Sequence, residues 1–236
     1  MEQIRIARPK SARRSARRAT PSLESQESSL TERAWRALEE EIVTLRIPPG
    51  SVVSEAGLSA RLGFGRTPVR EALQRLASEG LVQILPRRGV IVTDIDVAAQ
   101  LRLLEVRREI ERLLARSAAQ RSPPEVRNRF DSIAEVMEQA AERQDDMAFM
   151  RLDRAFNLLL LEAAANEFAT AAMRIINGLA RRFWYVHYKQ VADMPLAARL
   201  HAAVARAVAA GDPDAAAVAS DRLIDYIQDF SRKSIG

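Results

Sequence analysis

The chain of 236 residues contains no cysteine, two histidines and only 5% aromatic residues. The lack of cysteine excludes disulfides, thiolate metal sites and cysteine nucleophiles, and it suits a reducing compartment, so we expect a cytoplasmic protein. No apolar run approaches the ~18 residues that a membrane span needs. The N-terminus also lacks the apolar core of a secretory signal. We therefore expect no membrane partner.

The motifs of the common enzyme classes are also missing. There is no nucleophile elbow, Walker loop or Rossmann glycine fingerprint. A Glu-x-x-His di-iron pattern needs glutamate three residues before each histidine, but Trp184 precedes His187 and Ala198 precedes His201 in this way. The sequence therefore predicts a protein that is not an enzyme.

Lysine is scarce, because 33 of the 36 basic residues are arginine. Residues 1–20 carry a net charge of +6, residues 21–30 carry −2, residues 31–93 carry +2 and residues 94–236 carry −1. The excess positive charge therefore lies in the first 93 residues, which indicates a polyanionic partner for that part. Residues 1–30 have few large apolar side chains and are predicted to be a disordered basic tail. Either the tail attracts DNA non-specifically or it has no role.

Residues 31–93 show the pattern of a small DNA-binding domain. Apolar residues spaced three and four apart predict a helix over residues 31–45, with Thr31 as its N-cap. Ser54 is expected to cap a short second helix. After a glycine turn, a third helix is predicted from about Thr67, with Pro68 at its first position and Gly80 at its end. Residues 81–85 and 90–93 read as strands of a hairpin.

This order of elements predicts a winged helix-turn-helix, in which the start of the third helix reads DNA bases. Arg66 and Arg70 are four residues apart and project from one face of that helix. Arginine is the side chain that binds guanine O6 and N7 with two hydrogen bonds. Thr67 and the free amides at the helix start suit a phosphate. At the hairpin tip, Arg87 and Arg88 are expected to reach the neighbouring groove.

Residues 94–236 contain no strand signal. Six apolar stripes at helical spacing, with short connections between them, predict an antiparallel helical bundle. Ser122 is expected to cap the second of these helices. The predicted fold is thus mostly α, with a disordered basic tail over residues 1–30, a winged helix-turn-helix domain over 31–93 and an all-helical domain for effector binding and dimerisation over 94–236.

Four segments of the N-terminal part resemble GntR-type transcriptional regulators. They are Ile47–Gly50, Leu58–Gly63, Arg66–Leu73 (Arg-Thr-Pro-Val-Arg-Glu-Ala-Leu) and Glu79–Val82. The resemblance implies that Arg66, Thr67 and Arg70 contact a DNA operator. It also implies that the wing around Arg87, Arg88 and Gly89 assists. One departure is Gly65, where the family usually has serine or threonine. The missing hydroxyl is expected to reduce the stability of the helix cap by roughly a few tenths of a kcal/mol.

The helical part resembles the effector domain of the FadR subfamily, called FCD. This resemblance is carried by Glu105-Val106-Arg107 with Glu111, by Asp153–Asn157, by Leu200-His201 and by Ala210–Asp212. Many members hold a divalent metal with an aspartate and three histidines. By position, Asp153 and His201 match this set, Asn157 replaces one histidine and the last falls near Leu223. The metal is thus possible but its ligand set is incomplete. Asp153, Asn157 and His201 are either a weakened metal site or a hydrogen-bonded cluster in the effector pocket, and we favour the second.

Arg107 has two interpretations. Its planar guanidinium suits the carboxylate of an organic acid, and it equally suits a structural ion pair with a neighbouring glutamate. Together these observations predict a homodimeric transcriptional regulator, most simply a repressor, which binds a palindromic double-stranded operator and responds to a small organic acid in the helical domain. The alternatives are a metal-dependent sensor and a constitutive DNA binder whose bundle only dimerises.

Overall fold

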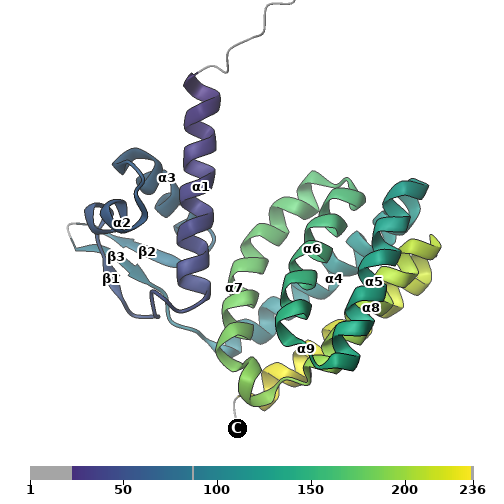
Figure 1. The fold of residues 1–236 in the computed structure, drawn as a ribbon. Coiled ribbons are helices and arrows are strands. Elements are labelled where there is room, and N and C mark those ends of the chain that lie inside the picture. Colours follow the sequence, from purple (N-terminus) through teal and green to yellow (C-terminus); the bar gives the residue numbers. More distant parts are fainter. Residues whose placement is uncertain (1–22, 87, 235–236) are drawn as a thin grey trace, which may run out of the picture.

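The computed structural model describes residues 23–86 and 88–234. Figure 1 shows a small N-terminal domain beside a larger bundle of helices. This confirms the mostly helical fold, with a winged helix-turn-helix followed by a helical domain. The elements are α1 (Leu23–Val43), β1 (Val52–Val53), α2 (Glu55–Leu62), α3 (Arg66–Ser78), β2 (Val82–Leu85), β3 (Gly89–Val92), α4 (Val97–Arg121), α5 (Pro124–Arg143), α6 (Asp146–Ala164), α7 (Glu167–Val191), α8 (Met194–Ala210) and α9 (Pro213–Lys233).

The first helix is longer than the sequence pattern predicts. It begins at Leu23, so residues 23–30 of the expected disordered tail are helical, while residues 1–22 lie outside the described residues. Proline and glycine are absent between Pro21 and Pro48, so nothing in the chain interrupts a helix there. Thr31 is therefore not an N-cap. Its hydroxyl instead donates to Glu71 Oε2 of α3 at 2.6 Å.

The helix-turn-helix forms largely as the sequence predicts. Ser54 caps α2 by accepting a hydrogen bond from the Gly57 amide, and Gly63 ends α2 in the left-handed conformation. The third helix begins at Arg66 rather than at Thr67, so Pro68 is its third residue and not its first. Proline is tolerated there because amides in the first helical turn have no partner within the helix. Gly65 is the N-cap and makes no side-chain hydrogen bond.

A three-stranded sheet in the order β1-β3-β2 forms the wing. The predicted hairpin of β2 and β3 is confirmed, with Val82 opposite Val92 and Leu85 opposite Gly89. The sequence did not indicate β1, because two residues are too few to show an alternating pattern. Gly89 has a φ of +98°, and a Cβ atom there would lie 2.9 Å from the carbonyl oxygen of Val53. The wing thus needs glycine at this position.

Two apolar cores hold the chain together. The N-terminal core joins α1, α2, α3 and the wing, and buries the predicted inner face of α3, namely Val69, Leu73 and Leu76. The second core lies among α4 to α9, where Phe130 and Phe156 pack edge to face with 6.2 Å between ring centroids. All six predicted bundle helices are present.

One expected cap in the bundle is wrong. Pro123, not Ser122, is the N-cap of α5, and the buried Ser122 hydroxyl has no hydrogen-bond partner among the described residues. The reason is the proline pair itself. Pro124 forces the residue before it, Pro123, into an extended conformation. The helix therefore begins one residue later than a cap at Ser122 would require.

Replacing Gly89 with alanine is expected to destabilise the wing by about 3 kcal/mol, because the side chain meets both the left-handed backbone and the Val53 carbonyl. The matched control is Gly63→Ala. Its φ is +71° but nothing lies within 4 Å of the added Cβ atom, so backbone strain alone costs about 1–2 kcal/mol. Denaturant unfolding of both variants measures how much free energy of unfolding each one loses. An equal loss in the two variants would contradict the steric role of Gly89.

Candidate nucleic-acid interface and effector site

The start of α3 presents three of the predicted contact residues on the surface. Arg66, Thr67 and Arg70 are all exposed, whereas Val69 between them is buried. The amphipathic pattern of α3 explains this division, because the same spacing that sends apolar residues into the core turns the arginines outward. At the wing, Arg88 is exposed and Gly89 begins β3. Arg87 lies outside the described residues.

Arg70 has a partner that sequence reasoning missed. Its guanidinium donates to both carboxylate oxygens of Glu55 at 3.0 to 3.2 Å, which ties α3 to the first residue of α2. The hydrogen bonds and the charge of Glu55 raise the pKa of Arg70. Both side chains are largely exposed, so the pair is accessible to solvent. Glu55 therefore orients Arg70 but also competes with any anion that approaches it. No pattern links residues fifteen apart, so the sequence alone did not reveal this pair.

A second polar group fixes α3 against α1. Glu79 is buried, and it accepts hydrogen bonds from the Trp35 indole at 2.9 Å and from Arg75 Nε at 3.0 Å. The Arg75 guanidinium lies 3.5 Å from the centre of the Trp35 ring and also donates to Glu32. Burial raises the pKa of Glu32, but Arg75 and Arg36 outweigh it and leave that pKa below its usual value. The orientation of the exposed arginines therefore depends on contacts at the other end of α3.

Inside the bundle, Asp153 and Asn157 of α6 meet His201 of α8. Asp153 Oδ1 lies 3.0 Å from His201 Nε2 and accepts a hydrogen bond from Asn157 Nδ2 at 2.9 Å. The other ring nitrogen, Nδ1, lies 2.8 Å from the carbonyl oxygen of Ala197. Both histidine nitrogens thus face acceptors, which favours the doubly protonated, cationic ring. The three predicted effector residues on α6 and α8 therefore form one hydrogen-bonded cluster.

The electrostatics of this cluster reinforce its charge separation. Burial raises the pKa of Asp153, but the hydrogen bond and charge of His201, with Arg107 and Arg181, outweigh it and hold the pKa below its usual range. Burial likewise lowers the pKa of His201, but Asp153, the Ala197 carbonyl and Glu111 outweigh it, so this pKa is raised above 6.5. These contacts therefore favour the carboxylate form of Asp153 and the imidazolium form of His201 relative to the isolated side chains.

Arg107 lies on α4, close enough to this cluster to affect the pKa of Asp153. Its Nε donates to Glu111 Oε1 at 2.7 Å, and both side chains are mostly buried. The structure therefore contains the ion pair that was one of the two interpretations of Arg107.

The donor set does not fit a tight transition-metal site. The Asp153 and His201 atoms that would bind a metal are hydrogen-bonded to each other, and the Asn157 amide nitrogen faces Asp153. Leu223, near which the resemblance places the last ligand, is a buried apolar residue. Within residues 23–86 and 88–234, no three histidine, aspartate or glutamate side chains gather as metal ligands would. A closed site needs four such donors.

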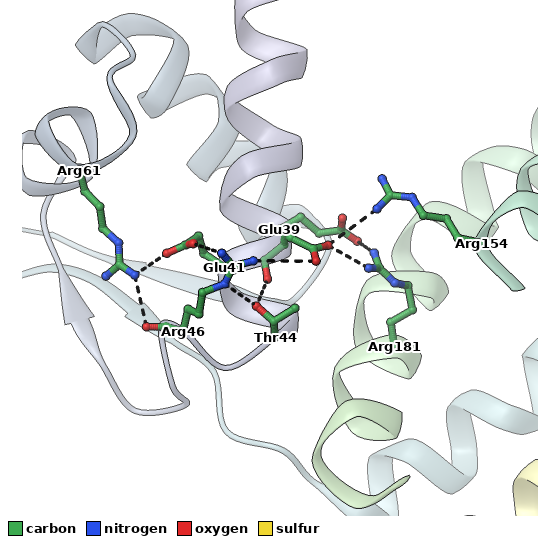
Figure 2. A network of polar contacts seen from close by, with 8 residues as sticks. Glu39, Glu41, Thr44, Arg46, Arg61, Arg154 and Arg181 are labelled. Atoms are coloured by element: carbon green, nitrogen blue, oxygen red, sulfur yellow. Dashed lines mark hydrogen bonds and ion pairs between the residues drawn. The ribbon is translucent and has the colours of Figure 1, made fainter. Parts of the chain in front are cut away.

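Ion pairs connect the bundle to the N-terminal domain (Figure 2). Arg181 of α7 donates to Glu39 at 2.9 Å and to Glu40 at 3.2 Å, and both glutamates belong to α1. Arg154 of α6 lies 3.8 Å from Glu40. Because Arg154 directly follows Asp153, the polar cluster and this interface share one turn of α6.

Comparisons with known proteins agree with this architecture. The sequence model described as "Bacterial regulatory proteins, gntR family" matches residues 30–92, and the one described as "FCD domain" matches residues 102–226, which is more than half of the chain. The chain belongs to the GntR family and carries an FCD domain. None of the described helices of this GntR-family regulator is long and apolar enough to cross a membrane.

Two relatives illustrate the likeness in sequence. The HTH-type transcriptional repressor RspR of Escherichia coli K12 is 29% identical over 204 residues, which cover 86% of this chain and 90% of RspR. A protein of Paenarthrobacter nicotinovorans, described as a probable D-xylose utilization operon transcriptional repressor, is 31% identical over 75% of this chain and 77% of its own.

Solved structures show the same fold. E. coli McbR/YncC has a TM-score of 0.73 at 19% identity and covers 88% of this chain and 99% of its own. A GntR regulator from Rhodococcus sp. RHA1 has a TM-score of 0.61 at 22% identity, with 88% and 98% covered.

The stability of this regulator is expected to depend on pH through His201 and Asp153. The raised pKa of His201 contributes stability below pH 6.5 that is lost as the pH rises through the raised value. The lowered pKa of Asp153 contributes stability above pH 3.8 that is lost as the pH falls through the lowered value. The pair therefore stabilises the fold most between these limits.

Denaturant unfolding at about pH 5.5 and about pH 8.5 tests this dependence. The wild type is expected to be more stable at the lower pH. His201→Phe should lose that difference, since a phenyl ring suits a site where Phe149 and Phe156 already pack against the imidazole. An unchanged difference in His201→Phe would assign the pH dependence to other groups.

Proposed function

We propose that this GntR-family regulator is a repressor that binds a palindromic DNA operator as a homodimer and is released by a small organic acid bound in its bundle. The observation that carries the first part is the division of α3 into a buried face and an exposed N-terminal end with Arg66, Thr67 and Arg70. Guanidinium groups at a recognition-helix start suit guanine, and the exposed threonine and first-turn amides suit a phosphate. The Arg88 tip of the wing supplies a second contact.

The pairing of Arg70 with Glu55 adds specificity to this surface. A phosphate or base that takes Arg70 must replace two hydrogen-bonded carboxylate oxygens. Only an acceptor with matching geometry compensates for that exchange, and Glu55 repels phosphates that approach out of register. The domain from residue 31 to residue 93 has a net charge of only +2, so placed arginines matter more than bulk charge.

Exposed apolar side chains support self-association of the bundle. Val106 and Leu113 of α4 are 56% and 47% exposed, and Phe168 and Ile175 of α7 are 79% and 47% exposed. Each pair is seven residues apart and so lies on one side of its helix. Apolar surface of this kind is typical of protein interfaces. A two-fold dimer would place two α3 helices on the two halves of a palindrome.

The effector site is proposed at Arg107, Asp153, Asn157 and His201. Two cationic groups, Arg107 and the imidazolium of His201, lie on α4 and α8 and face acidic partners on α4 and α6. An organic carboxylate that takes the place of one of these acidic partners would shift α6. That helix also carries Arg154, which faces Glu40 of the N-terminal domain. The ligand and the DNA would then be coupled, and the coupling is reciprocal.

Both relatives named above are described as repressors, which supports the sign of regulation proposed here. The rival is a constitutive DNA binder whose bundle only dimerises. The ion pairs between α6, α7 and α1 favour the responsive protein, because they connect the polar cluster to the DNA-binding domain.

Loss of either proposed base contact is expected to reduce sequence specificity. Arg66→Ala and Arg70→Ala should each weaken binding to a palindrome, selected by the protein from random DNA, by about 1–3 kcal/mol, roughly 5- to 150-fold. The matched control is Arg232→Ala on α9, which removes the same charge from an exposed side chain in the bundle. Gel shifts with the palindrome and with unrelated DNA give the two affinities, and their ratio measures the specificity. If both variants bind the palindrome like Arg232→Ala, the proposed interface is wrong.

A further inference from the structure

Arg182 of α7 is a buried cation without an anionic partner among the described residues. Its side chain donates from Nη1 to the Thr93 carbonyl at 2.8 Å, and from Nη2 to the Thr93 hydroxyl at 3.1 Å and the Asp94 carbonyl at 3.2 Å. All three acceptors are neutral. The residue is only 3% exposed, and its buried Nε has no hydrogen-bond partner in the described part of the chain. Buried charges are ordinarily paired, so this arrangement is incomplete.

The environment of Arg182 reflects this deficit. Burial lowers the pKa of Arg182, and the more distant charge of Asp94 opposes the shift only in part. Nearby Arg181, by contrast, has two carboxylate partners, and its pKa is raised. The two neighbours therefore differ in role. Arg181 forms ion pairs between the domains, whereas Arg182 has an N–H donor without a partner among the described residues.

Arg182 also lines a cavity of about 270 Å³ at the junction of the two domains. The wall combines the connecting segment at Thr93 and Asp94 with α4 and α7. Its apolar part comes from Leu103, Leu179 and Phe183. Its volume is slightly below the ~300 Å³ at which pockets for drug-sized ligands begin, which suits a small metabolite.

We propose that this junction cavity is a second ligand site, which binds a small monocarboxylate through Arg182. Nε has no accessible surface in this conformation, so the side chains that cover it must move before the carboxylate can accept its hydrogen bond and neutralise the buried guanidinium. The carbon chain would lie against Leu103, Leu179 and Phe183. Asp94 and Asp96 also line the cavity and repel any anion, but they repel a doubly charged phosphate more strongly than a singly charged carboxylate.

This site is distinct from the cluster at Arg107, Asp153 and His201. Its wall includes Gly80 and Thr93 from the N-terminal part and α4 and α7 from the bundle, so a ligand there touches both. Occupancy would therefore stabilise one relative placement of the DNA-binding domain. The site does not depend on the effector proposed for the bundle.

Calorimetric titration of the full-length protein tests the proposal, with acetate, butyrate and hexanoate as ligands at constant ionic strength. Affinity is expected to rise about fourfold for each methylene group that the apolar wall buries. Phosphate and 1-hexanol should not bind, because one carries too much charge and the other has no carboxylate. Norleucine differs from hexanoate by an ammonium group, and thus distinguishes an amino acid from a simple fatty acid as the ligand class.

Three variants locate the binding. His201→Phe alters only the bundle cluster and should keep hexanoate binding at the junction. Ala99→Leu, made together with His201→Phe, fills the cavity from α4 without removing Arg182, and should abolish hexanoate binding. Its control is Ala98→Leu with His201→Phe, at the exposed neighbouring position, which should bind like His201→Phe alone. Absence of carboxylate binding in His201→Phe, or binding that survives the addition of Ala99→Leu, would each overturn the junction site.

Discussion

The placement of the DNA-binding domain depends on one short stretch of α7, from Gly178 to Arg182. Gly178 allows Leu81 to approach closely, since a Cβ atom there would lie 2.9 Å from Leu81 Cδ1. Leu179 packs against the N-terminal core, Arg181 pairs with Glu39 and Glu40, and Arg182 holds the connecting segment at Thr93 and Asp94. The helix that carries these contacts belongs to the bundle's own core. Helix α7 is the bundle helix that lies beside α1 (Figure 1), so a displacement of α7 would reach the N-terminal domain through these contacts.

The abundance of arginine has a structural as well as a functional explanation. Several arginines join helices that are distant in sequence: Arg112 pairs with Asp221 across α4 and α9, and Arg206 with Glu138 across α8 and α5. A planar guanidinium with five donors makes such bridges with fewer lost rotamers per hydrogen bond than lysine does. Only a few arginines are exposed at the start of α3 and on the wing. Arginine content alone therefore does not measure the DNA-binding surface.

Two polar sites in the helical domain differ in how completely their charges are balanced. The cluster of Asp153, Asn157 and His201 satisfies its own hydrogen bonds, so it is stable without a ligand and needs an exchange of partners to respond. Arg182 at the junction has an Nε donor without a partner among the described residues, so a ligand that reaches it would add a hydrogen bond without replacing an ion pair. Helix α6 of the cluster faces α1 through Arg154 and Glu40, and Arg182 on α7 holds the connecting segment. We therefore propose the domain interface as the element through which either site would act on DNA binding.

The sequence by itself determined the order of the elements apart from β1, the two apolar cores and the exposed residues of α3, because these follow from local periodicity, caps and turns. It also placed Asp153 and Asn157 on one face of a helix. It misplaced the start of α1 and the cap at Ser122, where weak local signals compete. Only the tertiary structure decided between the two interpretations of Arg107, brought Arg70 to Glu55, and left Arg182 without an anion among the described residues. Such pairings bring together charges from separate turns or elements, and their energies depend on burial and distance, which no spacing in the chain specifies.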